Sequence, residues 1–165
     1  MSPEKVYQNL NQLHIPYQVY NHPPTPSVED ALPYWEKIDA AHCKNLFFRN
    51  HKGNKHYLVI FHHFKQLNIR QLEKLLKQGK LSFASEKRMT KYLGLTPGSV
   101  SPFGIINDSE KHVQLFIDKD LMQASHLSFH PNINTSTVVI SKDDFLKFLN
   151  YHGNPFIVLT FNPTS

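Results

Sequence analysis

The sequence predicts an α/β or α+β domain with a mixed β-sheet. Short strand-like runs are interspersed with short helix-like runs, and several of the strands follow one another in hairpin order. The chain has 165 residues, which suits one domain with a sizeable core, and it shows no repeat, low-complexity tract or linker. We therefore expect a single domain over residues 1–165, in which helices pack against a mixed sheet.

The N-terminal segment, residues 3–13, is predicted to be helical. Apolar residues recur there at helical spacing, at Val6, Leu10 and Leu13. Ser2 could cap this helix, and Pro3 suits its first position. The next run, residues 17–21, alternates in polarity and is predicted to be a strand.

A proline-dense segment, residues 22–27, follows and is predicted to be a loop. Ser27 with Asp30 resembles a capping box, which would begin a short helix that ends near Trp35. Pro33 falls inside that helix.

The centre of the chain is predicted to form a hairpin and then two helices. The expected strands are residues 43–49 and 55–63, joined by a turn at residues 50–54. The expected helices are residues 68–76 and 85–93, and Gly94 and Pro97 end the second one.

The C-terminal third is predicted to be rich in strands. The expected elements are a loop at 98–108, a strand at 112–118, two strands within 126–141 around Pro131 and Asn132, a helix from its cap at Ser141 to Gly153, and a strand at 155–161.

Composition narrows the function classes. No apolar run approaches the roughly 18 residues of a membrane helix, and the first residues lack the apolar core of a signal peptide. The single cysteine cannot form an internal disulfide, so we expect a cytoplasmic protein. A net charge of +5 is compatible with a polyanionic partner such as RNA, although many basic proteins bind no polyanion.

The sequence lacks the common motifs for nucleotides and metals. It has no glycine-rich phosphate loop, no His-Glu-x-x-His and no paired Cys-x-x-Cys. His56 and His62 share a strand face but lie about 20 Å apart, too far for one metal. Cys43 could be a reactive thiol beside Lys44, but a plain buried cysteine is the better interpretation. We therefore expect neither a metal nor another cofactor.

Lys44 is the most informative candidate residue. Side chains alternate along a strand, so Lys44, Leu46 and Phe48 share one face, with the lysine at the end of an apolar row. Either the ammonium extends to solvent from a strand end, or it points into a cavity and offers a fixed charge to a phosphate, a carboxylate or a developing oxyanion. Asn45 adds amide donors and an acceptor on the opposite face or at the rim.

Two further segments could contribute to a site. The loop 94–104 contains three glycines and two prolines, so its backbone could approach a ligand and offer N–H groups to a carbonyl or phosphate oxygen. His130 precedes a proline and could donate or accept a hydrogen bond near neutral pH. Taken alone, the glycine loop is better explained as an ordinary Pro/Gly turn, and the alternative for His130 is an ordinary turn histidine.

Together these segments carry a family resemblance. "KNLFFR", "KLSFASEKRM…LGLTPGSVSPFGIIND" and "FHPNINTSTVVIS", in this order, closely resemble the YbaK/prolyl-tRNA-synthetase-associated editing domain family. The resemblance covers about residues 17–161, and it is nearest to the freestanding deacylases that remove alanine from mischarged tRNA for proline. It implies a mixed, curled, barrel-like sheet with peripheral helices.

The resemblance also implies roles for individual residues. Lys44 would be essential for deacylation, Gly98 would position the ester carbonyl through backbone N–H groups, and His130 would lie beside the aminoacyl group. The positions that would bind the substrate or the tRNA end are Asn45, Lys80, Ser99, Val100, Ser101 and Pro102. Lys80 falls where relatives often carry a basic residue that helps to hold the tRNA end, and because it is a lysine and not an arginine, bidentate binding of a phosphate is in doubt.

The implied reaction is metal-independent hydrolysis of an aminoacyl ester, with a ribose hydroxyl orienting the water. The implied partners are the acceptor end of tRNA(Pro) and prolyl-tRNA synthetase, and no membrane. A small pocket would admit alanine and exclude proline, with Tyr20, Val28 and Phe103 as candidate walls. Two alternatives remain: a deacylase for a tRNA mischarged with cysteine or serine, and a non-catalytic module that binds tRNA or a synthetase.

Overall fold

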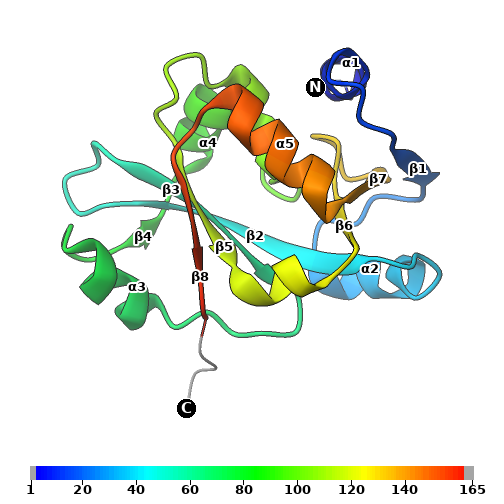
Figure 1. Ribbon diagram of the computed structural model, residues 1–165. Coiled ribbons are helices and arrows are strands. Elements are labelled where there is room, and N and C mark those ends of the chain that lie inside the picture. Colours follow the sequence, from blue (N-terminus) through cyan, green and yellow to red (C-terminus); the bar gives the residue numbers. More distant parts are fainter. Residues whose placement is uncertain (1–2, 162–165) are drawn as a thin grey trace.

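The computed structural model describes residues 3–161, and its elements alternate along the chain as the sequence predicts (Figure 1). The α-helices are α1 (Glu4–Gln12), α2 (Val28–Trp35), α3 (Ile69–Leu76), α4 (Glu86–Leu93) and α5 (Lys142–His152). The strands are β1 (Gln18–Asn21), β2 (Ala41–Arg49), β3 (His56–His62), β4 (Ser82–Phe83), β5 (Gln114–Asp118), β6 (His126–Phe129), β7 (Ser136–Ser141) and β8 (Phe156–Leu159). Two 3₁₀ helices, η1 (Pro102–Asn107) and η2 (Lys119–Gln123), complete the chain.

The eight strands form one mixed, open sheet. Seven strands follow the order β1-β7-β6-β2-β3-β5-β8, and β4 pairs with β2 outside that path. The β2–β3 hairpin is antiparallel, whereas β3–β5, β5–β8 and β2–β6 are parallel pairs. The mixed sheet and its helices confirm the predicted class, and the path runs from β1 at one edge to β8 at the other without closing into a barrel.

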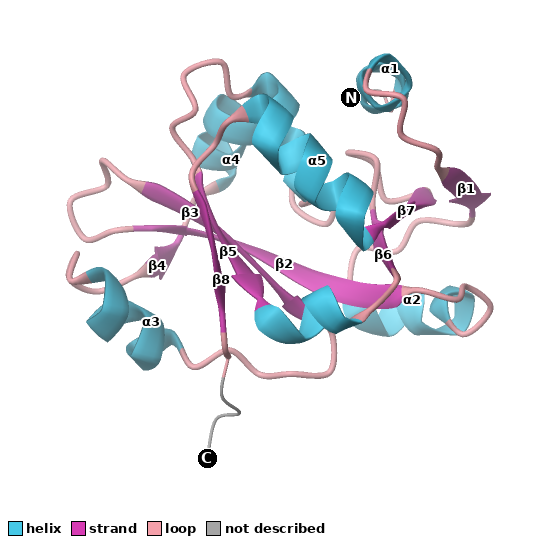
Figure 2. Ribbon diagram, in the orientation of Figure 1, coloured by secondary structure: helices cyan, strands magenta, loops and turns pink. Residues whose placement is uncertain are grey.

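Helices cover both faces of the sheet (Figure 2). On one face, α1, α4 and α5 pack on alternate residues of the central strands, among them Phe47, Leu58 and Ile60. On the other face, α3 packs on the intervening residues, including Phe48 and Val59. Because β2 is covered on both faces, successive side chains of this strand enter different environments.

The structure adds elements that the sequence did not predict. Residues 102–107 form the 3₁₀ helix η1 where a loop was expected, because the Ser101 hydroxyl caps the N–H of Phe103 and Pro102 suits a first helical turn. Strand β4 is only two residues long, and β8 is shorter than its predicted range. The proposed cap Ser2 lies outside the described residues.

The helices of the described chain are all too short or too polar to cross a membrane.

Two buried histidines couple stability to pH. Arg88 donates to Nε2 of His56 at 3.0 Å, so the Nδ1–H of His56 faces Nε2 of His112 at 2.9 Å. Burial, and then the positive charges of neighbouring groups, lower the pKa of His56 to about 4. Burial and then Lys111 lower the pKa of His152 to about 4 as well. Both imidazoles are therefore neutral in the folded state at neutral pH.

We expect the free energy of unfolding to rise between pH 4 and pH 6.5 and to show no further contribution from these two groups above that window. In the window the unfolded state binds more protons than the folded state, so each imidazole lowers stability by about 3 kcal/mol at pH 4. Urea unfolding at a series of pH values measures the slope. The variant His152→Gln keeps a donor for Asn9 and should remove about half of the slope contributed by the two histidines. An unchanged slope would contradict this assignment.

Candidate functional site

A cavity of about 360 Å³ lies in a notch along one edge of β2. On that edge β2 pairs with β6 only at Ala41 and His42, and with β4 only at Phe48 and Arg49. The residues between these two pairings, 43–47, line the cavity. The sheet therefore opens where the sequence places the "KNLFF" motif, and the cavity reaches both faces of the strand.

The backbone of β2 also faces this cavity. The carbonyl of His42 accepts from His63 on the β3 side, whereas the carbonyl of Phe47 accepts from Ala84 on the opposite side. Backbone groups alternate between the two edges of a strand, so the N–H and C=O groups of Cys43 and Asn45 point to the notch. A ligand in the cavity can therefore meet main-chain donors and acceptors as well as side chains.

Lys44 and Asn45 enter the cavity from opposite faces of β2. Lys44 is half-buried and lies in the row of Leu46 and Phe48, as the alternation predicts. Asn45 shares the face of Phe47, and its Oδ1 is buried with no hydrogen-bond partner among the described residues. A buried carbonyl oxygen without a donor costs about 1–3 kcal/mol, so this oxygen is poised to accept from a ligand.

His130 contributes an acceptor nitrogen at the β6 end of the notch. It follows β6 and lines the cavity together with Lys44. Its Nδ1–H donates to the carbonyl of Ser136 at 2.9 Å, which leaves the Nε2 lone pair for a ligand. Burial lowers the pKa of His130, so the neutral form is favoured.

The glycine loop forms the opposite wall, where Pro97, Gly98 and Val100 line the cavity. Gly98 has φ +87°, and a Cβ on it would lie 3.3 Å from the Cα of Pro26, so the loop packs closely on the proline-dense segment. The N–H groups of Gly98 and Val100 make no hydrogen bond to another described residue. Among the loop residues that line the cavity, these two could therefore donate to a ligand.

Four predicted binding residues lie outside the lining. The N–H of Ser99 is donated to the carbonyl of Thr96, Ser101 is fully buried and caps η1, and Pro102 begins η1. These three residues shape the loop and do not face the cavity. Lys80 is exposed just before β4 and does not line the cavity, so its role in holding a tRNA end stays a prediction.

Only one of the three predicted wall residues lines the cavity. Val28 does so, from the first turn of α2. Tyr20 lines a separate cavity near β1, and Phe103 is fully buried against Phe129 and Phe148. Trp35 is mainly core, as expected, because it stacks on His42 with ring centroids 4.8 Å apart, although its edge also reaches the cavity.

The structure also brings lining residues that sequence reasoning missed. They are Thr25, Pro26, Ser27, Glu29, Ala31, Phe83, Ala84 and Met89. Most of them line the cavity because the 22–27 loop and α2 pack across the notch. No local sequence pattern predicts that packing. Only the proline density of that loop marked it as irregular backbone able to cover a site.

Cys43 is buried, and burial raises the pKa of its thiol, which supports the interpretation as a plain buried cysteine. Within the described residues, no group of three or more His, Cys, Asp or Glu side chains is arranged to hold a metal ion.

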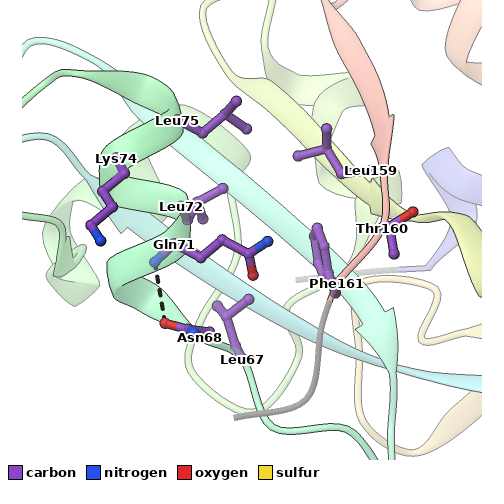
Figure 3. A pocket seen from close by; sticks show the side chains of 9 residues that line it. All are labelled: Leu67, Asn68, Gln71, Leu72, Lys74, Leu75, Leu159, Thr160 and Phe161. Atoms are coloured by element: carbon purple, nitrogen blue, oxygen red, sulfur yellow. Dashed lines mark hydrogen bonds between the residues drawn. The ribbon is translucent and has the colours of Figure 1, made fainter. Parts of the chain in front are cut away.

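A second cavity, of about 400 Å³, differs in character (Figure 3). Side chains of α3, including Leu72 and Leu75, face Leu159 and Phe161 across it. It contains none of the motif residues, whereas the β2 notch gathers Lys44, Asn45 and His130. Ligand sites combine apolar walls with a few converging polar groups, so the β2 notch is the candidate site.

Comparison with known proteins identifies the family of the chain. The family described as "Aminoacyl-tRNA editing domain" matches residues 22–148, which include the whole notch. The chain is 40% identical over 157 residues to the prolyl-tRNA editing protein ProX of Acetoanaerobium sticklandii, covering 93% of each. It is 32% identical over 159 residues to prolyl-tRNA synthetase associated domain-containing protein 1 of Mus musculus, covering 94% of each.

Solved structures show the same fold. A crystal structure described as a candidate trans-editing enzyme for prolyl-tRNA synthetase superimposes with a TM-score of 0.75 at 18% identity, covering 99% of each chain. With the family match over most of the chain and a relative at 40% identity, the protein belongs to the aminoacyl-tRNA editing domain family.

Proposed function

We propose that this protein is a trans-editing deacylase that hydrolyses the ester bond of mischarged tRNA(Pro), with Ala-tRNA(Pro) as the main substrate. The observation that carries the proposal is the notch in β2. It gathers Lys44, Asn45, the N–H groups of the 97–100 loop and His130 from separate parts of the chain around one cavity. The name of the ProX relative supports prolyl-tRNA as the substrate class.

The chemistry needs positioning more than a strong nucleophile. An aminoacyl ester on ribose is already activated, so a water molecule must be held near its carbonyl and the developing oxyanion must meet donors. The N–H groups of Gly98 and Val100 are suited to the oxyanion. Lys44 supplies positive charge for the adenosine end and the ester.

His130 has a defined part in this scheme. Because its Nδ1–H is committed to Ser136, the neutral ring can only accept at Nε2. It would therefore orient a hydroxyl, a water or the amino group of the substrate. Asn45, with its unpartnered Oδ1, would accept a hydrogen bond from the terminal adenosine.

The test is release of alanine from Ala-tRNA(Pro) by the purified protein, compared with the spontaneous rate in buffer. Catalysed release supports a deacylase. Tight tRNA binding without release would favour the non-catalytic module, and faster release of serine or cysteine would assign the protein to the alternative substrates.

We expect Gly98→Ala to lower kcat/KM for deacylation at least tenfold. The new Cβ would strain the backbone at φ +87° and press on Pro26 at 3.3 Å, which displaces the donors of the loop. Gly153→Ala is the matched control, because Gly153 has φ +80° but no atom within 4 Å of its Cβ position. Both variants should lose about 1–2 kcal/mol of stability. Equal activity of the two variants would remove the loop from the mechanism.

A further inference from the structure

A further cavity, which we call the α4 cavity, lies beside the β2 notch, on the other side of the β4–α4 segment. It measures about 310 Å³ and is lined by Gly53, Ser85, Lys87, Arg88, Lys91 and Tyr92. Ala84 and Met89 line the notch, whereas their neighbours Ser85 and Arg88 line the α4 cavity. Adjacent residues of one segment thus line both cavities, so the two cavities are neighbours.

Positively charged side chains gather at the α4 cavity. Lys87 and Lys91 are exposed and one helical turn apart on α4, and Arg88 lies between them. The guanidinium of Arg49, at the end of β2, comes 3.0 Å from the Cβ position of Gly53, and that of Arg88 comes 2.9 Å from the same point. We call these four residues the α4 basic face.

Acidic groups do not neutralise this face. The ion pairs between described residues join Lys65 to two aspartates and Lys142 to Asp143, and none involves the α4 basic face. The nearest acid on the same helix, Glu86, is exposed and forms no such pair. The charges of Arg88, Lys91 and Arg49 also help to lower the pKa of the neighbouring His56, as expected for an unneutralised cluster.

The arrangement is also pre-organised. Arg88 donates from Nη1 to the carbonyl of Gly53 at 2.8 Å and to His56 at 3.0 Å, so the guanidinium is held in place. Its Nη2 lies beside Arg49 near Gly53. One guanidinium held by hydrogen bonds, a second one beside it and two exposed lysines suit a chain of phosphates better than a single carboxylate. Guanidiniums bind planar oxyanions, and lysines add point charges along a backbone.

We propose that the α4 basic face binds the phosphodiester backbone of the RNA substrate, next to the nucleotide that enters the β2 notch. This inference rests on the proposed function. An acceptor end whose terminal nucleotide occupies the notch would pass its preceding phosphates across α4. Binding there would recognise backbone and not sequence, and it would be steeply dependent on salt.

The test replaces the two exposed lysines and measures binding without catalysis. The double variant Lys87→Gln/Lys91→Gln is compared with Arg70→Gln/Lys74→Gln, which removes two exposed charges from α3, a helix of the same length that does not line the notch. Dissociation constants for uncharged tRNA(Pro) are measured between 50 and 200 mM salt. We expect the α4 variant to bind about tenfold more weakly and its salt slope to fall by about 2, while the α3 variant matches the wild type.

Kinetics separate this inference from the proposed function. Hydrolysis of Ala-tRNA(Pro) is compared with hydrolysis of an alanyl ester of adenosine, which lacks the upstream phosphates, and the deficit of the α4 variant should be larger for the tRNA. If the wild type hydrolyses both substrates but the α4 and α3 variants bind tRNA equally well with the same salt slope, the inference is overturned and an acidic protein surface becomes the better partner. If the wild type hydrolyses neither substrate, the proposed function fails, whatever the binding data show.

Discussion

Lys44→Ala is expected to lower the rate of alanine release from Ala-tRNA(Pro) by at least 100-fold. The lysine stands half-buried at the open edge of β2, in the cavity that also holds His130 and the loop donors. Removing a fixed charge aimed at developing negative charge costs about 10²–10³ in rate when water is excluded from the site. Single-turnover hydrolysis of the charged tRNA measures the loss.

The fold should tolerate this change. Lys44 forms no ion pair with another described residue, and truncation removes no buried apolar group, so the melting temperature should shift by only a few degrees. The matched control for charge is Lys55→Ala, which replaces an exposed lysine immediately before the partner strand β3. Activity of Lys44→Ala within a few-fold of the wild type would refute the role of the lysine as an electrostatic clamp.

The elements were predictable because each has a local cause. Ser27, Asn68, Ser85 and Ser141 each cap a helix through the side-chain oxygen. Strand alternation placed Lys44 and Asn45 on opposite faces, and both line the cavity. In these cases the deciding interaction lies within a few residues of the pattern that signals it.

The notch itself could not be predicted from the residues. It exists because β6 and β4 pair with opposite ends of the same edge of β2. The β6 partner Leu127 lies 127 − 41 = 86 residues after Ala41, and the β4 partner Phe83 lies 83 − 48 = 35 residues after Phe48. Pairing over such separations depends on the whole fold and leaves no local pattern. The same reason explains why Tyr20 and Phe103 were poor choices for the pocket wall, whereas Val28, next to a recognisable cap, was a good one.

The family resemblance implied roles for the motif residues, and the structure shows which of these residues line the cavity. Ser99, Ser101 and Pro102 belong to the family motif but do not line the cavity, whereas Gly98 and Val100 line it and their N–H groups form no backbone hydrogen bond with a described residue. A motif marks residues that a site requires without distinguishing contact from support. Hydrogen bonds made within the loop make that distinction.

The enzyme is expected to clear Ala-tRNA(Pro) about 100-fold faster, or more, than Pro-tRNA(Pro). The cavity is bounded by the 22–27 loop, α2, α4 and the 97–100 loop, so a larger side chain must displace packed backbone. Overpacking a rigid site costs about 1–3 kcal/mol and occasionally more, and the ring of proline cannot change shape to fit.

Small residues should be separated less steeply. One extra atom on a small side chain changes binding to a pocket by only about 1 kcal/mol at the low end of the usual range, so Ser-tRNA(Pro) and Cys-tRNA(Pro) should be hydrolysed about tenfold more slowly than Ala-tRNA(Pro). Parallel time courses on the four charged tRNAs, each corrected with Lys44→Ala protein for spontaneous hydrolysis, provide the comparison. Equal rates for alanine and proline would exclude an editing role, because the enzyme would then destroy the correct product, and a faster rate for serine or cysteine would assign the notch to that amino acid.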